Sequence, residues 1–299
     1  MKQAKALLHF DLHTHTRASD GLLTPSELVA YARKKGLAGI AVTDHDSVDG
    51  LEEALAAGRE WGYPVVPGVE FTTDYGPYEV HLLAYFIDHR HPELTARPAE
   101  VAAGRLARAE RMVARLAALG YPVPWEAVRA QAPGPYIGRP HVVRALVAAG
   151  VVPRKEAERF FQEYLIPGAP AYVPHEELAT EEAVRLALVA GGVPVLAHPG
   201  RVGGLEMLPE LVGLGLAGLE ADYPRHSAGE IAHYRRLASA YDLIPTGGSD
   251  FHGDPAGPAL GQASCGPESV VALARRARSP VGRTFLSNLH IPEEIWEGW

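Results

Sequence analysis

The sequence has a single cysteine, Cys265, so it cannot form an intramolecular disulfide. This excludes the disulfide-stapled folds of small secreted proteins and fits a reducing compartment. No apolar run approaches the roughly 20 residues of a membrane-spanning helix, and the first residues are not apolar enough for a signal peptide. Positive charge is not in excess either, because 28 Lys and Arg residues stand against 36 Asp and Glu, a net charge of −8. We therefore expect a cytoplasmic protein that has no membrane partner and does not bind nucleic acid through bulk charge.

The 299 residues are 47% hydrophobic, which is enough for one large domain or two modest ones. Short β-like runs alternate with helical patterns over residues 1–95 and again over 176–299, and this rhythm predicts an α/β fold. Six or seven strand–helix units indicate a closed or nearly closed parallel barrel. The expected strands are 7–12, 39–43, 65–71, 80–86, 193–197, 217–220 and 243–249.

Helix boundaries carry local signals in this sequence. Thr24 and Glu27 form a capping-box pattern around Pro25, and Gly36 predicts the end of the same helix. Further helices are expected over 51–61, 181–190 and 228–241, the last opened by a second capping-box pattern.

Residues 96–175 are expected to form a helical insertion that separates two parts of the barrel. Helical patterns cover 98–119, 125–131, 141–149 and 154–164 with no clear strand between them. Residues 96–170 contain 11 Lys and Arg against 6 Asp and Glu, so this segment is basic in an acidic protein. A solvated helix surface and a phosphate-binding role both explain that charge.

Histidines follow several of the expected strands. His13 and His15 lie two residues apart at the end of the first strand, a spacing that points both imidazoles to one face of a strand. Asp250 and His252 repeat this step after the last strand, and His45 directly follows the second. A His-x-His pair by itself is also common among ordinary surface histidines.

Other carboxylates and histidines join them to form a larger set. Glu70 and His81 are expected at the ends of neighbouring parallel strands, where the active sites of βα barrels are built. The full set is His13, His15, Asp20, His45, Glu70, His81, His198, Asp250 and His252. Mixed nitrogen and oxygen ligands suit manganese, zinc or iron rather than magnesium or calcium. Nine ligands fit two or three ions with Glu70 as the bridging carboxylate; separate caps and hydrogen-bonded histidines are the alternative.

The motifs that carry these residues resemble those of the PHP (polymerase and histidinol phosphatase) superfamily of metal-dependent phosphoesterases. The resembling segments are His13-Thr-His-Thr-Arg-Ala-Ser-Asp20-Gly, Thr43-Asp-His45-Asp, Val69-Glu70, His81, Ala197-His198-Pro-Gly-Arg201 and Ser249-Asp250-Phe-His252. The resemblance implies a distorted (β/α)7 barrel with a trinuclear metal centre. Carried over by position, it implies a first ion held by His13, His15, Glu70 and Asp250, a second by Glu70, His81 and His198, and a third by Asp20, His45 and His252.

Within this superfamily, the insertion and its Ile137-Gly-Arg-Pro-His141 motif resemble the branch that acts on nucleoside 3′,5′-bisphosphates. Members of that branch remove the 3′-phosphate, and some also trim short RNA from its 5′ end. The resemblance thus implies a manganese-dependent phosphatase with a nucleotide substrate and short RNA as a further one. A histidinol-phosphate phosphatase shares the metal motifs, and a catalytically silent, metal-binding regulatory module is an alternative of another class. No feature indicates an obligate protein partner.

A second phosphate on the substrate needs its own cationic partners. Arg139 and His141 in the insertion and Arg201 after the fifth strand are the candidates, because a guanidinium can bind two phosphate oxygens together. We expect Glu70 and His226 to be the catalytic residues, with His226 as the acid that protonates the leaving oxygen. Surface ion pairs are the alternative for the arginines, and an ordinary helix-entry histidine is the alternative for His226.

Overall fold

Seven strands form one curved sheet in chain order in the computed structural model, which describes residues 8–76, 78–95, 98–132, 134, 136–174, 178–202 and 205–289. The strands are β1 (Phe10–Asp11), β2 (Gly39–Val42), β3 (Val65–Tyr75), β4 (Tyr78–Tyr85), β5 (Val193–Leu196), β6 (Gly218–Asp222) and β7 (Ile244–Gly247). The edges approach each other where Leu12 N–H donates to the Gly247 carbonyl at 3.1 Å. The expected nearly closed α/β barrel is therefore confirmed. The first residue expected in β1, Leu7, lies outside the described residues.

The expectation that all neighbouring strands run parallel is wrong at β4. This strand pairs antiparallel with both β3 and β5, while the other pairs are parallel. Only residues 76 and 77 separate β3 from β4, and a parallel crossover needs a dozen residues or more. Glu70 consequently does not end its strand, since β3 continues to Tyr75 in a long hairpin.

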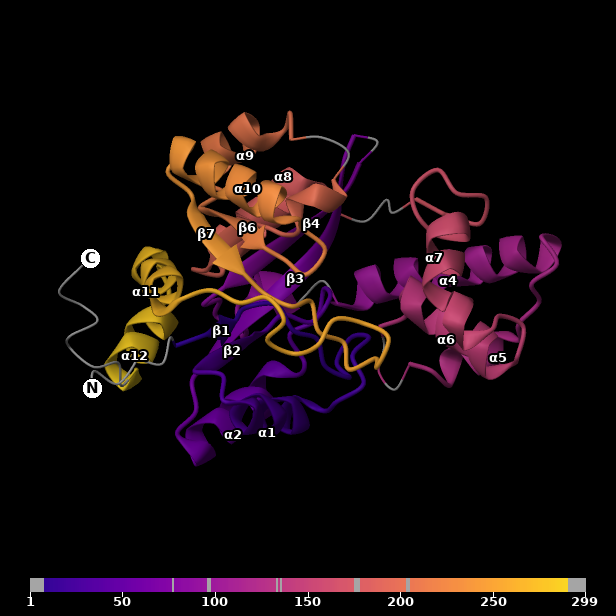
Figure 1. Ribbon diagram of the computed structural model, residues 1–299, viewed down its shortest axis with the longest axis horizontal. Helices are drawn as coiled ribbons and strands as arrows, with labels where there is room; N and C mark the ends of the chain where they lie inside the picture. The colour runs from indigo at the N-terminus through magenta and orange to yellow at the C-terminus, as the bar shows by residue number, and fades with distance from the viewer. Residues whose placement is uncertain are drawn as a thin grey trace.

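Helices cover the outside of the sheet. Figure 1 shows α1 and α2 on one side of the strands, α8, α9 and α10 on the opposite side, and α11 and α12 at the end away from the insertion. These helices are α1 (Pro25–Lys35), α2 (Leu51–Trp61), α3 (Pro92–Thr95), α8 (Thr180–Val189), α9 (Leu208–Leu214), α10 (Ala228–Ala240), α11 (Pro267–Arg276) and α12 (Pro280–Asn288). Both expected capping boxes are present, at Thr24 and Ser227, and Gly36 ends α1 in the left-handed conformation. None of the described helices combines the length and apolarity that a membrane crossing requires.

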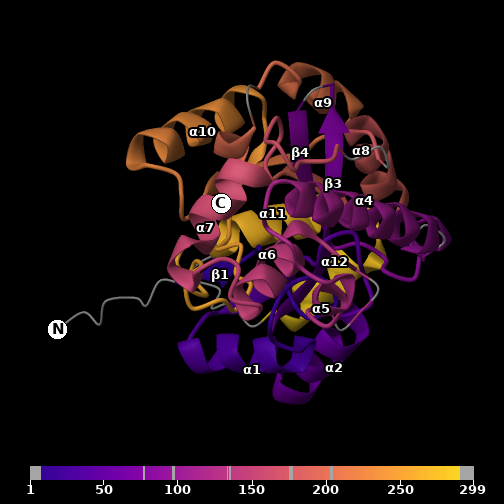
Figure 2. The same cartoon turned by 90° about the vertical axis from the view of Figure 1, so that its right-hand side faces the viewer.

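The insertion is helical and has its own hydrophobic core. Its helices are α4 (Pro98–Ala118), α5 (Trp125–Arg129), α6 (Arg139–Ala148), η1 (Arg154–Glu156) and α7 (Ala157–Tyr164). Buried residues from Ala109 to Val173 pack together as a cluster distinct from the two clusters of the barrel. These helices project from one end of the molecule (Figure 1), and Figure 2 views them in front of the barrel. The division at 96–175 stays a prediction.

Side-chain alternation decides which residues face the barrel interior. In β6, Leu219 and Ala221 belong to the hydrophobic cluster that includes residues of the outer helices. Because successive side chains of a strand point to opposite faces, Glu220 between them faces inward. In β3, Val69 and Phe71 belong to that cluster in the same way, and Glu70 faces inward. Two carboxylates therefore enter the interior from opposite parts of the sheet, and both are fully buried.

Candidate metal centre

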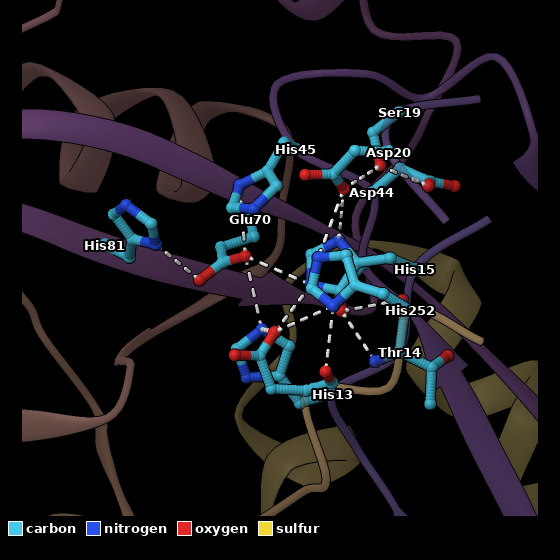
Figure 3. Close-up of polar contacts among 12 residues, drawn as sticks. His13, Thr14, His15, Ser19, Asp20, Asp44, His45, Glu70, His81 and His252 are labelled. Carbon is cyan, nitrogen blue, oxygen red and sulfur yellow. Dashed lines mark hydrogen bonds and ion pairs between the residues drawn. The ribbon is translucent and has the colours of Figure 1, made fainter. Parts of the chain in front are cut away.

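Buried histidines and carboxylates from several strands and their following loops lie close together, and Figure 3 shows many of them around Glu70. His13 and His15 follow β1, and His45 follows β2, where it bridges to Glu70 on β3. His81 reaches the same place because β4 runs antiparallel, which puts the early part of β4 beside the later part of β3. The reason for this proximity is thus a hairpin and not two parallel strand ends.

Glu70 is the centre of the arrangement, because its carboxylate contacts five imidazoles. Its Oε1 lies 2.8 Å from His81 Nδ1 and 3.0 Å from His198 Nε2. Its Oε2 lies 3.2 Å from His13 Nε2, 3.3 Å from His15 Nε2 and 3.1 Å from His45 Nδ1. One buried carboxylate thus has imidazoles on both of its oxygens, the arrangement that a bridging carboxylate requires.

Three groups of side chains each bring their ligand atoms within 4.8 Å of one another. The groups are His13, His15, Glu70 and Asp250; His45, Glu70 and His81; and His15, Asp20, His45 and His252. The first equals the set implied for a first ion, and the third adds His15 to the set implied for a third. The second has His45 where His198 was expected, while His198 contacts Glu70 Oε1, the oxygen that His81 also contacts. The ligand role of the nine residues stays a proposal.

Buried atoms without hydrogen-bond partners test whether a metal fits this place. Among the described residues, such atoms include His13 Nε2, both ring nitrogens of His15, Asp20 Oδ2, Glu70 Oε2, His81 Nε2 and His198 Nδ1. Buried polar atoms are normally paired, so a concentration of unpaired ones needs an explanation. Nitrogen and oxygen atoms that lie within 4.8 Å of one another in three groups offer the mixed donor set of a borderline divalent ion. The residues therefore fit divalent ions.

The charges of the site are strongly coupled. Burial disfavours the ionised form of Glu70, but the surrounding histidines, His45 foremost, hold its pKa well below the usual range. Burial also disfavours the charged form of His15, but the carboxylates of Asp250 and Glu70, at 3.2 Å and 3.3 Å from its Nε2, raise its pKa to about 10. The carboxylate field that favours protons on His15 also attracts divalent cations.

Further buried carboxylates support the loops that carry these residues, and the sequence reasoning missed them. Asp11 accepts hydrogen bonds from Ser249 N–H at 2.8 Å and Gly261 N–H at 2.8 Å, and burial raises its pKa to about 6. Asp44 accepts from Thr16 N–H at 2.7 Å and from the Ser19 hydroxyl at 2.6 Å. The sequence did offer a signal for them, because Asp11 lies two residues before His13 and Asp44 directly precedes His45.

Arg139 and His141 lie at the start of α6 and face the barrel, but their polar atoms are engaged. Arg139 Nη2 pairs with Glu79 at 2.5 Å, and the side chain is mostly buried. Burial lowers the pKa of His141 to about 4, so its ring is neutral, and Nδ1 accepts the Gly138 N–H at 3.0 Å. A phosphate-binding role for either stays a prediction, and for Arg139 it requires competition with Glu79.

Arg201 and His226 come from the barrel, after β5 and after β6. Arg201 Nη1 is 3.7 Å from Asp250 Oδ2, and 38% of its side chain is exposed. His226 donates from Nδ1 to the Ala221 carbonyl at 2.9 Å, and its Nε2 accepts the Gly200 N–H at 3.3 Å. Both ring nitrogens of His226 therefore bind backbone groups. Its role as a proton donor stays a prediction, and the geometry favours a residue that positions the loop after His198.

Arginines of the insertion contact a carboxylate and a backbone carbonyl of the barrel. Arg105 on α4 pairs with Asp46, and both side chains are buried. Arg144 on α6 donates to the Asp20 carbonyl at 2.5 Å. Much of the positive charge seen in the sequence is therefore used in docking the insertion to the barrel.

Comparisons with known proteins agree with this geometry. The model of the PHP domain family matches residues 11–96. A 3′,5′-nucleoside bisphosphate phosphatase from Chromobacterium violaceum is 37% identical over 252 residues, which cover 82% of this chain and 88% of that protein. The 5′-3′ exoribonuclease Rnm from Salmonella typhimurium is 33% identical over 298 residues, 97% of this chain and 93% of that one. A crystal structure described as a metal-dependent phosphoesterase from Bifidobacterium adolescentis superposes with a TM-score of 0.82 at 35% identity, covering 92% of this chain and 98% of its own.

Proposed function

We propose that this chain, which belongs to the PHP domain family, is a metal-dependent phosphoesterase that removes the 3′-phosphate from nucleoside 3′,5′-bisphosphates. The observation that carries the proposal is the convergence of five histidines on Glu70, with unpaired buried nitrogen and oxygen atoms around it. The substrate is taken from the phosphatase of Chromobacterium violaceum, with which this chain shares 37% of its residues over most of both lengths.

The nine proposed ligands hold two or three divalent ions, with manganese as the leading ion and zinc or iron as alternatives. When bound, such ions lower the pKa of water toward neutrality and offset the charge on phosphoryl oxygens. Glu70 keeps the imidazoles in place between the strands, since its two oxygens contact all five. The second residue proposed as catalytic, His226, would have to give up its bond to Gly200 N–H to carry a proton on Nε2.

Substrate binding is assigned to residues of the barrel and of the insertion. Arg201 is partly exposed beside Asp250, and Asp250 also lies 3.2 Å from His15 Nε2, so the guanidinium is able to meet a phosphate oxygen while Asp250 keeps another partner. Arg139 and His141 come from the start of α6 in the insertion, and Arg139 pairs with Glu79 of β4. Cationic groups from both the barrel and the insertion suit a substrate with two phosphates.

The direct test is an assay of the manganese-loaded protein with adenosine 3′,5′-bisphosphate. We expect AMP and inorganic phosphate in equal amounts. Histidinol phosphate and p-nitrophenyl phosphate are run beside it, because a histidinol-phosphate phosphatase shares the metal motifs. Turnover of histidinol phosphate without formation of AMP would reject the proposed substrate, and binding of metal with no turnover of any ester would support the silent regulatory module.

The substrate-binding role of Arg201 is tested by a substitution, with the same substitution at a surface arginine as the matched control. Arg201→Met should raise KM for the bisphosphate about tenfold or more while changing KM for p-nitrophenyl phosphate less, since one charge-assisted contact to a phosphate contributes about 1.5–3 kcal/mol. Arg159→Met removes an exposed arginine of α7 that pairs with Glu163 and should change neither. Equal effects of Arg201→Met on both substrates would contradict the role.

Short RNA is the second candidate substrate, because the Rnm exoribonuclease of Salmonella typhimurium aligns over 97% of this chain. We expect 5′-phosphorylated RNA of a few nucleotides to yield mononucleotides from the 5′ end. A 5′-hydroxyl oligonucleotide of the same sequence is the control, and equal turnover of both would argue against recognition of the 5′-phosphate.

A further inference from the structure

A buried carboxylate on β6, Glu220, connects two of the proposed metal ligands. Glu220 is completely buried. It faces the barrel interior, whereas its neighbours Leu219 and Ala221 pack toward the outer helices. Its Oε1 lies 3.0 Å from Nδ1 of His13, which follows β1. Its Oε2 accepts the backbone N–H of His198, after β5, at 2.8 Å. One side chain thus engages ligand residues that are far apart in the sequence.

The contact with His13 determines which ring nitrogen faces the site. An ionised carboxylate only accepts hydrogen bonds, so His13 Nδ1 must carry the proton. Nε2 is then the ring nitrogen left to bind an ion. This atom is buried, has no hydrogen-bond partner among the described residues, and lies 3.2 Å from Glu70 Oε2 and 3.6 Å from Asp250 Oδ1. Glu220 therefore turns Nε2 of His13 toward the carboxylates of the proposed centre.

The contact with His198 holds an unusual backbone conformation. His198 has φ +25° and ψ +63°, on the left-handed side that L residues seldom adopt. Such a conformation persists only where the surroundings enforce it. The hydrogen bond from His198 N–H to Glu220 supplies that constraint, and in this conformation His198 Nε2 reaches Glu70 Oε1 at 3.0 Å.

We infer that Glu220 is a positioning residue of the metal centre, which fixes the tautomer of His13 and the backbone of His198 so that both rings present a nitrogen to the ions. This inference rests on the proposed function only through the existence of the metal centre. Carboxylates behind metal-bound histidines typically change metal affinity 10- to 100-fold.

Glu220→Gln is the sharpest variant, because it keeps the shape and one acceptor oxygen but offers an amide N–H₂ to one of the two partners. A donor opposite His13 Nδ1 forces the proton of His13 to Nε2, and a donor opposite His198 N–H removes the backbone constraint. Asp222→Asn is the matched control, because it removes the same charge from the same strand but breaks only a partly exposed pair with Arg235.

The first measurement is manganese binding by equilibrium dialysis with elemental analysis. The wild type and Asp222→Asn should bind manganese alike, whereas the weakest ion of Glu220→Gln should dissociate 10- to 100-fold more readily. Equal affinity of Glu220→Gln and the wild type would overturn the inference while leaving the metal centre intact. Failure of the wild type to bind manganese would instead remove the centre itself and the inference with it.

The second measurement detects the proton of His13 in the wild type, and a variant serves only to assign the signal. In zinc-loaded wild type with ¹⁵N-labelled histidine, the His13 ring should show a protonated Nδ1, assigned through the signal that is lost in His13→Gln. A proton on His13 Nε2 would contradict the inference.

Discussion

At the scale of single residues, the site depends most on Glu70. Its two oxygens contact five histidines contributed by β1, β2, β4 and β5 segments, so no other single side chain joins as many parts of the centre among the described residues. Replacing its charge should therefore affect every proposed ion that it contacts. The same replacement at a glutamate on the surface should have a negligible effect on metal binding.

Glu70→Gln should lower kcat/KM on the bisphosphate by at least about 1,000-fold, because loss of charge stabilisation by metal ions amounts to several kcal/mol. Elemental analysis of the same preparation should show fewer bound ions than in the wild type. Glu52→Gln, at a half-exposed carboxylate on α2 that pairs with Arg90, is the control and should retain both. Full metal content with full activity in Glu70→Gln would refute the bridging role.

The lowered pKa of His141 predicts that the free energy of unfolding decreases at acidic pH. Burial lowers its pKa to about 4, whereas an unfolded histidine titrates near 6.5. Above pH 6.5 the residue is neutral in both states, so its full contribution to stability is present. As the pH falls from 6.5 to 4, the unfolded state takes up the proton first, and stability decreases by a few kcal/mol at most.

The measurement for His141 is urea unfolding of the wild type and His141→Gln at several pH values between 4 and 8. The difference in unfolding free energy should be constant above pH 7 and should shift in favour of the variant below pH 6. Glutamine retains an acceptor for Gly138 N–H at this capping position. A difference that does not change with pH would contradict the lowered pKa.

At the scale of elements, the insertion is attached to the barrel through α4 and α6, and the contact made by α4 is a buried ion pair. Arg105 pairs with Asp46, which also accepts the Thr72 N–H on β3 at 3.1 Å. Asp46 lies one residue after His45 and has φ +47°, so this ion pair also fixes the loop that carries a proposed ligand. The docking of the insertion and the geometry of the centre are therefore coupled at one buried pair.

Arg105→Met should destabilise the protein by about 3–5 kcal/mol, because it leaves the Asp46 carboxylate buried without its partner. Arg105→Met combined with Asp46→Asn should recover part of that loss, since no charge is then left unpaired. Thermal unfolding of the two single variants and the double variant gives the coupling energy. Additive losses in the double variant would show that the pair does not couple the two elements.

The seam between β7 and β1 depends on a glycine. A Cβ on Gly248 would lie 2.3 Å from His13 Cβ and 2.4 Å from His13 N. Gly248→Ala should therefore push His13 from its place, cost about 1–3 kcal/mol, and weaken metal binding. Gly213→Ala in α9, where nothing lies within 4 Å of the added methyl, is the control. Equal manganese binding in the two variants would contradict the close packing.

Sequence patterns predicted those elements whose signals are local. Thr24, Pro25, Glu27 and Gly36 placed the ends of α1 because capping depends on a few neighbouring residues. The direction of β4 was missed, since strand boundaries were placed too far apart to show that the linker is a hairpin. Glu220 was missed because its partners follow other strands, and only the folded sheet brings them within 3.0 Å.

At the scale of the whole molecule, the proposed ions join the barrel but not the insertion. The nine proposed ligands lie on or just after strands or in the 16–20 loop, and none belongs to α4–α7. The insertion has a separate hydrophobic cluster. Bound ions should therefore stabilise the strands directly, and the insertion only through its contacts with the barrel.

Chelation should lower Tm by roughly 5–15 °C, because a ligand present at 100 to 1,000 times its Kd stabilises the folded state by about 3–4 kcal/mol. In hydrogen exchange, chelation should reduce protection most in β1, β2 and β5, which carry His13, His45 and His198 at their ends, and least in α5 and α7. The Glu70→Gln variant, with fewer ions to lose, should respond less to the chelator. A uniform loss of protection over the barrel and insertion would mean that the two parts unfold as one unit, and an unchanged Tm would mean that the ions contribute nothing to stability.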